Sequence, residues 1–234
     1  MHLKIKANTF VFNKEDQKME NQNLRKTANT IRMLYPLWML VGMFSLMYIP
    51  SQLMVSDDPV LTAQNIANNT TLFRVGIVTS LITQLLFIII PIYWFRLYEA
   101  IDKNLAIWML VFSLISVPMC MYNEMNKLAA LSFLDEPEQL LFYLKMNGKG
   151  IVLVSIFWGL WLFPLGKLAI DSGFFPKLVG WLLYIGGIGY LISSFMYFIA
   201  PELEDLRMMA EMLTMGEVLF IIWFLIKGIH IKDT

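Results

Sequence analysis

The chain has 234 residues, of which 58% are apolar and 15% are charged. Soluble domains carry about 45–50% apolar and about 25% charged residues, so this composition excludes an ordinary soluble fold. The 18 basic and 18 acidic side chains cancel, and without a basic excess we expect no binding of nucleic acid.

The first 30 residues differ in composition from the rest of the chain. Residues 1–30 are polar and contain no apolar core, so we expect a cytoplasmic N-terminal tail, helical toward its end, and no cleavable signal peptide. Residues 31–230 contain six apolar windows that are long enough to cross a bilayer as helices. The predicted spans are residues 31–55, 72–95, 104–127, 150–169, 177–199 and 208–229. The predicted fold is therefore all-α, a polytopic membrane bundle of about six transmembrane helices embedded in the lipid bilayer.

Two connections carry a helix-start signal. Residues 57–59 (Asp-Asp-Pro) and 135–137 (Asp-Glu-Pro) each place an acidic cap before a proline at the first helical position. The first signal predicts a short helix that ends at residues 68–70, where the second span begins. The other predicts a separate segment that ends at Asn147-Gly148, just before the fourth span.

The distribution of basic residues predicts the orientation of the bundle. With the N-terminus inside, the cytoplasmic parts hold thirteen Lys and Arg residues and the outer parts hold five. Six of the seven tryptophans also lie within six residues of those cytoplasmic Lys and Arg positions, as expected for an aromatic belt. We therefore expect both termini in the cytoplasm (N-in, C-in) and a location in the inner (plasma) membrane.

Familiar catalytic and metal-binding patterns are missing from the sequence. It has no Gly-x-Ser-x-Gly, His-Glu-x-x-His or Gly-x-x-x-x-Gly-Lys motif. The two histidines, His2 and His230, lie outside the apolar windows, and Cys120 is the single cysteine. We therefore predict no catalytic residues, no metal site and no cofactor.

Glu217 is the most notable polar residue in a predicted span. Counting inward from Lys227 at 1.5 Å per residue places it roughly 15 Å deep, near the middle of the bilayer. A carboxylate at that depth needs a partner, water or a proton. It is either a proton or cation site or a structural polar contact between helices. Arg74, at the entrance of the second span, is either its partner or an arginine whose head reaches the outer surface.

A further group of polar residues lies near the outer ends of the spans. Glu124 and Lys127 are three residues apart and can pair on one helix face, although a solvated helix end is the simpler interpretation. Asn123 and Lys149 lie at the same outer level, and Gln84 in the second span is expected to hydrogen-bond between helices. With Glu217 and Arg74, these are the candidate residues of an intramembrane polar site.

Small residues follow one face of the fifth span. Gly186, Gly189 and Ser193 are spaced so that they form a smooth stripe, which allows a neighbouring helix to approach closely. We interpret the stripe as a packing surface.

Three stretches of the sequence resemble a known family. They are residues 63–67 with 72–76 (Ala-Gln-Asn-Ile-Ala and Leu-Phe-Arg-Val-Gly), residues 166–180, and residues 216–228. All three are similar to segments of the bacterial membrane proteins grouped as domain-of-unknown-function family 4386, over about residues 31–230. The resemblance implies the six-span fold and draws attention to Arg74 and Glu217. It implies no reaction, and the longer polar N-terminal tail departs from the family pattern.

Three classes of function remain. The chain binds or translocates a small solute or ion through a polar site in the bundle, or it is a non-catalytic partner of lipid or another protein, or it is an intramembrane enzyme. The missing motifs make the enzyme least favoured. A wet cavity that reaches Glu217 would favour transport, whereas a dry bundle with an exposed groove would favour a binding partner. Nothing in the sequence defines an oligomeric state.

Overall fold

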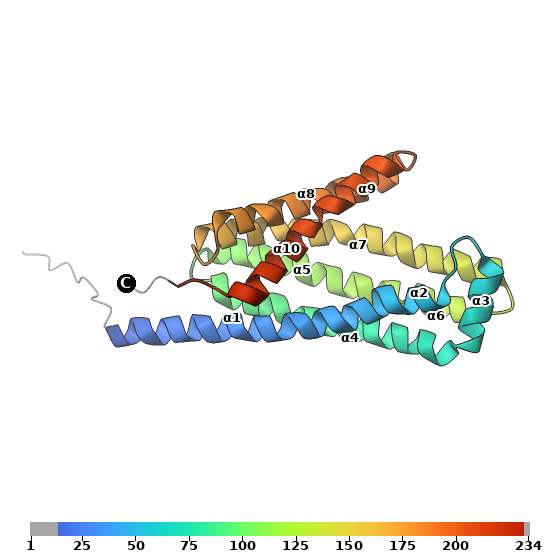
Figure 1. Ribbon diagram of the computed structural model, residues 1–234, viewed down its shortest axis with the longest axis horizontal. Coiled ribbons are helices and arrows are strands. Elements are labelled where there is room, and N and C mark those ends of the chain that lie inside the picture. Colours follow the sequence, from blue (N-terminus) through green and yellow to red (C-terminus); the bar gives the residue numbers. More distant parts are fainter. Residues whose placement is uncertain (1–13, 232–234) are drawn as a thin grey trace, which may run out of the picture.

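The computed structural model describes residues 14–231, with side chains from residue 17 onward, and these residues form helices without strands (Figure 1). Six helical stretches are long and apolar enough to span a membrane: Gln17–Leu53, Thr70–Tyr98, Lys103–Phe133, Pro137–Asp171, Lys177–Ile199 and Glu204–Lys227. The predicted all-α bundle of six membrane-spanning helices is confirmed. Hydrophobic side chains on the outside of the bundle are therefore expected to face lipid.

The first and third stretches contain more than one helical segment. The first consists of α1 (Lys14–Met43), a π-helical turn (Phe44–Tyr48) and α2 (Ile49–Leu53). After α3 (Pro59–Asn68) and α4 (Thr70–Tyr98), the third stretch consists of α5 (Lys103–Asn123), α6 (Met125–Ala130) and a 3₁₀ turn (Leu131–Phe133). Residues 14–30, predicted as the tail, continue into the first span as one helix, because their polar side chains include good helix formers such as Lys, Glu and Gln.

The two ends of the bundle are distinct. The N-terminal start of α1 and the C-terminal end of α10 lie at one end, here called the termini end, and α3 lies at the other, here called the α3 end (Figure 1). Asp58 accepts a hydrogen bond from the Leu61 N–H at 2.8 Å and Pro59 begins α3, so this predicted helix start is confirmed. An even number of spans places both described termini on one side of the bundle.

One predicted break is wrong. Asn147 and Gly148 do not end a helix, because α7 runs without interruption over 35 residues from Pro137 to Asp171. The Asn147 side chain donates to the backbone carbonyl of Asn123 in α5. This contact ties the first third of α7 to its neighbour, and a glycine within a helix costs only about 1 kcal/mol.

The last span is broken where the sequence predicts a continuous helix. It consists of α9 (Glu204–Leu213) and α10 (Met215–Lys227), which meet at Thr214. Both pack on α8 (Lys177–Ile199) through its small residues. A Cβ atom at Gly189 would lie 2.7 Å from the Ala210 carbonyl oxygen, so the predicted packing role of the stripe is confirmed.

Candidate functional site

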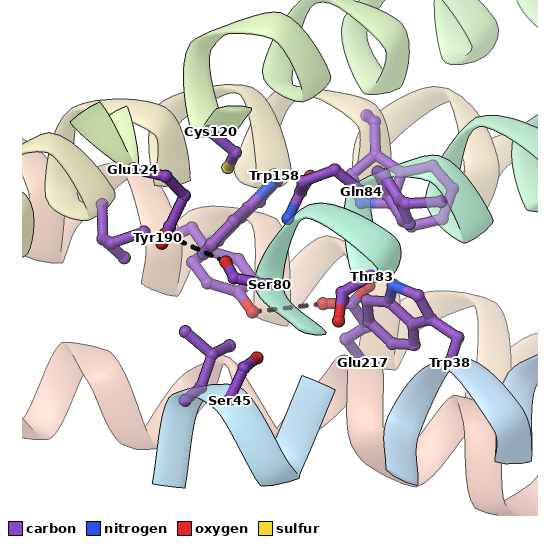
Figure 2. A pocket seen from close by; sticks show the side chains of 14 residues that line it. Trp38, Ser45, Ser80, Thr83, Gln84, Cys120, Glu124, Trp158, Tyr190 and Glu217 are labelled. Atoms are coloured by element: carbon purple, nitrogen blue, oxygen red, sulfur yellow. Dashed lines mark hydrogen bonds between the residues drawn. The ribbon is translucent and has the colours of Figure 1, made fainter. Parts of the chain in front are cut away.

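A cavity of about 210 Å³ lies inside the helix bundle. Seven of its lining residues are non-aromatic and carry a polar or thiol group: Ser45, Ser80, Thr83, Gln84, Cys120, Glu124 and Glu217. Five more are aromatic: Trp38, Phe87, Trp158, Trp161 and Tyr190 (Figure 2). The lining therefore combines two carboxyl groups with large apolar rings, and it comes from the first, second, third, fourth, fifth and sixth spans.

Glu217 lies in the first turn of α10 and lines the cavity toward the termini end. Its carboxylate accepts a hydrogen bond from the Tyr190 hydroxyl at 3.2 Å (Figure 2). Thr214 ends α9 three residues earlier, and Gly216 lies so close to α8 that any Cβ there would overlap the Leu182 carbonyl oxygen. The break and the close approach together bring Glu217 into the bundle.

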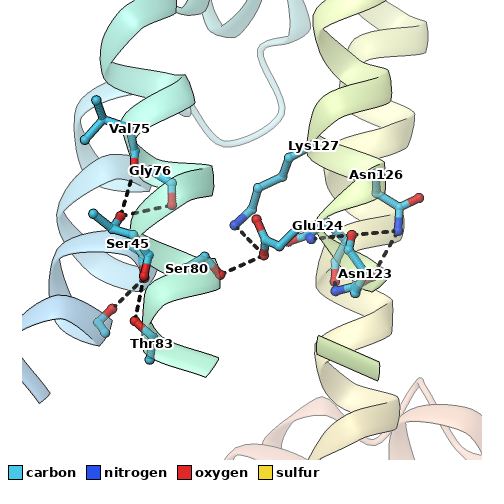
Figure 3. A network of polar contacts seen from close by, with 12 residues as sticks. Ser45, Val75, Gly76, Ser80, Thr83, Asn123, Glu124, Asn126 and Lys127 are labelled. Atoms are coloured by element: carbon cyan, nitrogen blue, oxygen red, sulfur yellow. Dashed lines mark hydrogen bonds and ion pairs between the residues drawn. The ribbon is translucent and has the colours of Figure 1, made fainter. Parts of the chain in front are cut away.

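Glu124 lines the same cavity from the junction between α5 and α6 and is only 3% exposed. Its Oε1 atom accepts hydrogen bonds from Ser80 at 2.9 Å and from the Lys127 ammonium at 3.1 Å (Figure 3). Its Oε2 atom is buried and has no hydrogen-bond partner among the described residues. The predicted Glu124–Lys127 pair is present, but the solvated helix end is wrong, because both side chains are buried, at 4% and 10% exposure.

A layer of buried aromatic residues lies between the cavity and the termini end. Trp94 donates a hydrogen bond to the Tyr35 hydroxyl at 3.1 Å and packs on Phe224 with ring centroids 5.0 Å apart. Phe220 and Phe175 complete the layer, with ring centroids 5.2 Å apart. All five side chains are at most 4% exposed. This aromatic layer meets the cavity lining where Tyr35 packs edge to face on Trp38, with ring centroids 6.0 Å apart.

The π-helical turn forms part of the cavity wall. A π turn widens the helix by one residue, and such turns often occur at functional sites. Here the turn carries Ser45 and Leu46, which both line the cavity. The Ser45 hydroxyl donates to the Gly42 carbonyl oxygen at 3.1 Å, so its hydrogen is already used within its own helix.

The other predicted residues are divided between the cavity and its surroundings. Gln84 lines the cavity. Asn123 lies behind it, where its amide donates to the Asn147 carbonyl oxygen at 2.8 Å and lies against Gly150. Arg74 and Lys149 are exposed, and neither has a hydrogen bond or ion pair within the described residues. The predicted pairing of Arg74 with Glu217 is wrong, because the arginine lies on the outer face of α4 near the α3 end.

Sequence reasoning missed the hydroxyl partners of both carboxylates. Tyr190 directly follows Gly189 of the small-residue stripe. That stripe marks the part of α8 that meets the last span. Ser80 lies four residues before Gln84, which places both on one face of α4. Among the described residues, no group of three or more His, Cys, Asp or Glu side chains is arranged to hold a metal ion.

The fold and the cavity define a multi-pass membrane protein with a polar and aromatic site inside its helix bundle. Residues 32–228 match the model of the family described as domain of unknown function DUF4386, and the chain belongs to this family. A protein of Archaeoglobus fulgidus, named only as an uncharacterized protein, is 37% identical over 78 residues, which are 33% of this chain and 46% of that protein. The match thus covers less than half the length of that relative. No solved structure matches the chain.

Proposed function

We propose that the protein binds a small solute or ion in the central cavity and carries it across the membrane. The observation that carries this proposal is that Glu217 and Glu124 line one cavity inside the bundle. Acidic side chains within a membrane are costly, and those that persist typically belong to substrate or ion pathways. The proposal places the protein in the inner (plasma) membrane with both termini in the cytoplasm.

The contacts of the two carboxylates differ. Glu124 has an ion-pair partner in Lys127, so its charge is compensated within the protein. Glu217 has only the neutral Tyr190 hydroxyl as a hydrogen-bond partner among the described residues. A charge that the protein itself leaves unbalanced needs water, a proton or a bound cation, and the last two support a binding role for Glu217 rather than a purely structural one.

The shape of the site supports transport over a fixed binding function. The aromatic layer separates the cavity from the termini end by packed rings, whereas the other side is bounded by hydroxyl, amide and charged groups near Glu124. A carrier needs one closed and one openable side at a time. The π turn at Phe44–Tyr48 and the α5–α6 junction at Glu124 interrupt regular helical hydrogen bonding in the cavity wall, and the break at Thr214 does so three residues before Glu217.

Cys120 gives a direct test, because it lines the cavity and is the single cysteine of the chain. Sealed vesicles of both orientations would be treated with the membrane-impermeant thiol reagent 2-(trimethylammonio)ethyl methanethiosulfonate, and modification measured by intact mass. We expect Cys120 to be modified in both vesicle types, because a carrier exposes its site to each side in turn.

Two variants provide controls. Cys120→Ser should show no modification in either vesicle type. Lys145→Cys in that background, at an exposed position near the α3 end, should be modified in one vesicle type only and so shows that the vesicles are sealed. Modification of Cys120 in neither vesicle type, or in a single type, would contradict the proposed transport.

A further inference from the structure

We propose that the solute is a small organic ammonium ion, held with its charge at Glu217 and its apolar body against the aromatic walls. This inference rests on the proposed function and names the chemical class of its substrate. It follows from the charge of the cavity, the nature of its walls and its size.

The charge of the lining selects a cation with one positive charge. The Glu124 carboxylate and the Lys127 ammonium form a buried pair at 3.1 Å, with side chains 4% and 10% exposed, and their charges cancel. Glu217 then leaves one uncompensated negative charge when it is ionised. No Lys, Arg or His lines the cavity itself, and Lys127 is already paired, so the site offers an anion no partner.

The aromatic walls favour an organic cation over a metal ion. Trp38 stacks on Phe87 with ring centroids 5.5 Å apart, and Phe87 meets Trp161 edge to face at 5.7 Å. Trp158 packs edge to face on Tyr190, whose hydroxyl holds Glu217, at 6.2 Å. Indole faces attract ammonium groups, whereas a metal ion gives up its water only for several oxygen, nitrogen or sulfur ligands.

The volume of the cavity limits the size of the solute to one ring with a few additional non-hydrogen atoms. A cavity of roughly 150 Å³ holds benzene, and this cavity measures about 210 Å³. Sites for drug-sized ligands occupy about 300–1,000 Å³. A primary amine on a short chain with one ring is therefore close to the upper limit of size.

Two residues that line the cavity each carry a buried polar atom without a partner among the described residues. Glu124 Oε2 and Trp38 Nε1 are buried, and neither has a hydrogen-bond partner in the part of the chain that the structure describes. Buried polar atoms are otherwise nearly always satisfied. In the view of Figure 2 the Tyr190 ring lies between Glu124 and Glu217, and all three residues line the cavity.

Three probes of nearly equal size separate charge from shape: phenethylammonium, the neutral 2-phenylethanol and the anionic phenylacetate. Binding to the purified full-length protein in detergent would be measured by isothermal titration calorimetry. We expect phenethylammonium to bind at least about ten-fold more tightly than 2-phenylethanol, as expected for a desolvated charge with cation–π contacts, and phenylacetate not to bind.

Variants assign this preference to particular side chains. Glu217→Gln keeps the size of the side chain and should abolish the preference for the ammonium over the alcohol. Glu211→Gln is the matched control, because Glu211 lies in α9 outside the cavity and pairs with Arg207, and it should leave the preference unchanged. Trp158→Leu should weaken binding of the ammonium more than that of the alcohol. Melting curves identify any variant that fails to fold, and the three wild-type probes test the inference without any variant.

The outcomes distinguish this inference from the proposed function. Equal binding of phenethylammonium and 2-phenylethanol, or no binding of phenethylammonium, would overturn the ammonium class. An ammonium preference that persists in Glu217→Gln would also overturn it. The labelling of Cys120 from both sides would in each case still support transport of another solute, whereas its failure would contradict transport even if phenethylammonium binds.

Discussion

Replacing Gly189 by alanine tests the contact that sets the last span against α8. A Cβ atom at this position would lie 2.7 Å from the Ala210 carbonyl oxygen, 2.7 Å from the Leu213 Cβ and 3.0 Å from the Thr214 nitrogen. Ordinary carbon contacts begin near about 3.5 Å, so α9 has to move away by a large fraction of an ångström. Two of the three atoms belong to backbone, which cannot turn aside as a flexible side chain can.

The cost follows from overpacking and from helix propensity. Overpacking of a close contact costs about 1–3 kcal/mol, whereas replacing glycine by alanine within a helix contributes up to about 1 kcal/mol in the opposite direction. Gly148→Ala is the matched control, because a Cβ there meets nothing within 4 Å. We therefore expect Gly189→Ala to be less stable than Gly148→Ala by about 1–3 kcal/mol.

Unfolding of the purified variants in mixed detergent micelles, followed by circular dichroism, measures this difference. Gly148→Ala should unfold at the same or a higher denaturant concentration than the parent, and Gly189→Ala at a lower one. If the two variants unfold together, α9 does not pack against the small-residue stripe, and the explanation for the placement of Glu217 would be wrong as well.

Two further predictions concern the buried ion pair and the topology. Lys127→Met leaves the Glu124 carboxylate without its counter-charge and should cost about 3–5 kcal/mol of stability. Adding Glu124→Gln should restore much of that loss, as measured by the same unfolding assay. A double variant no more stable than Lys127→Met would refute the compensation. Reporter fusions after Lys103 and after Thr234 should report the cytoplasm and a fusion after Asp58 the outside, and an external report from the Thr234 fusion would refute the predicted orientation.

The helices and the fold class are predictable from the sequence because hydrophobicity acts locally. Each span is a run of apolar residues long enough to cross a bilayer, and Asp58 with Pro59 fixes the start of α3 through contacts within four residues. The helix end that the sequence wrongly predicts at Asn147 shows the limit of such local signals. Its amide bonds with Asn123 on another helix, and no pattern within α7 indicates that partner.

The candidate site is predictable only in part, for the same reason. The depth of Glu217 follows from counting residues along one helix, but the choice between Tyr190 and Arg74 as its partner depends on how three helices are rotated. Glu124 and Lys127 are close in sequence, so their pairing is predictable. The burial of that pair is not predictable from the sequence, because it arises from neighbouring spans.

The sequence already separates the two carboxylates by depth, and the structure gives them different partners. Glu124 has a permanent counter-ion three residues away, so its charge is settled when the helix folds. Glu217 has no cation within its own helix turn, because Lys227 lies ten residues further on, and α8 offers it only a hydroxyl. In the proposed function, the protein compensates one acid permanently, and the solute that enters the cavity compensates the charge of the other. A site with both acids compensated would bind no cation, and one with neither compensated would bear the cost of two buried charges.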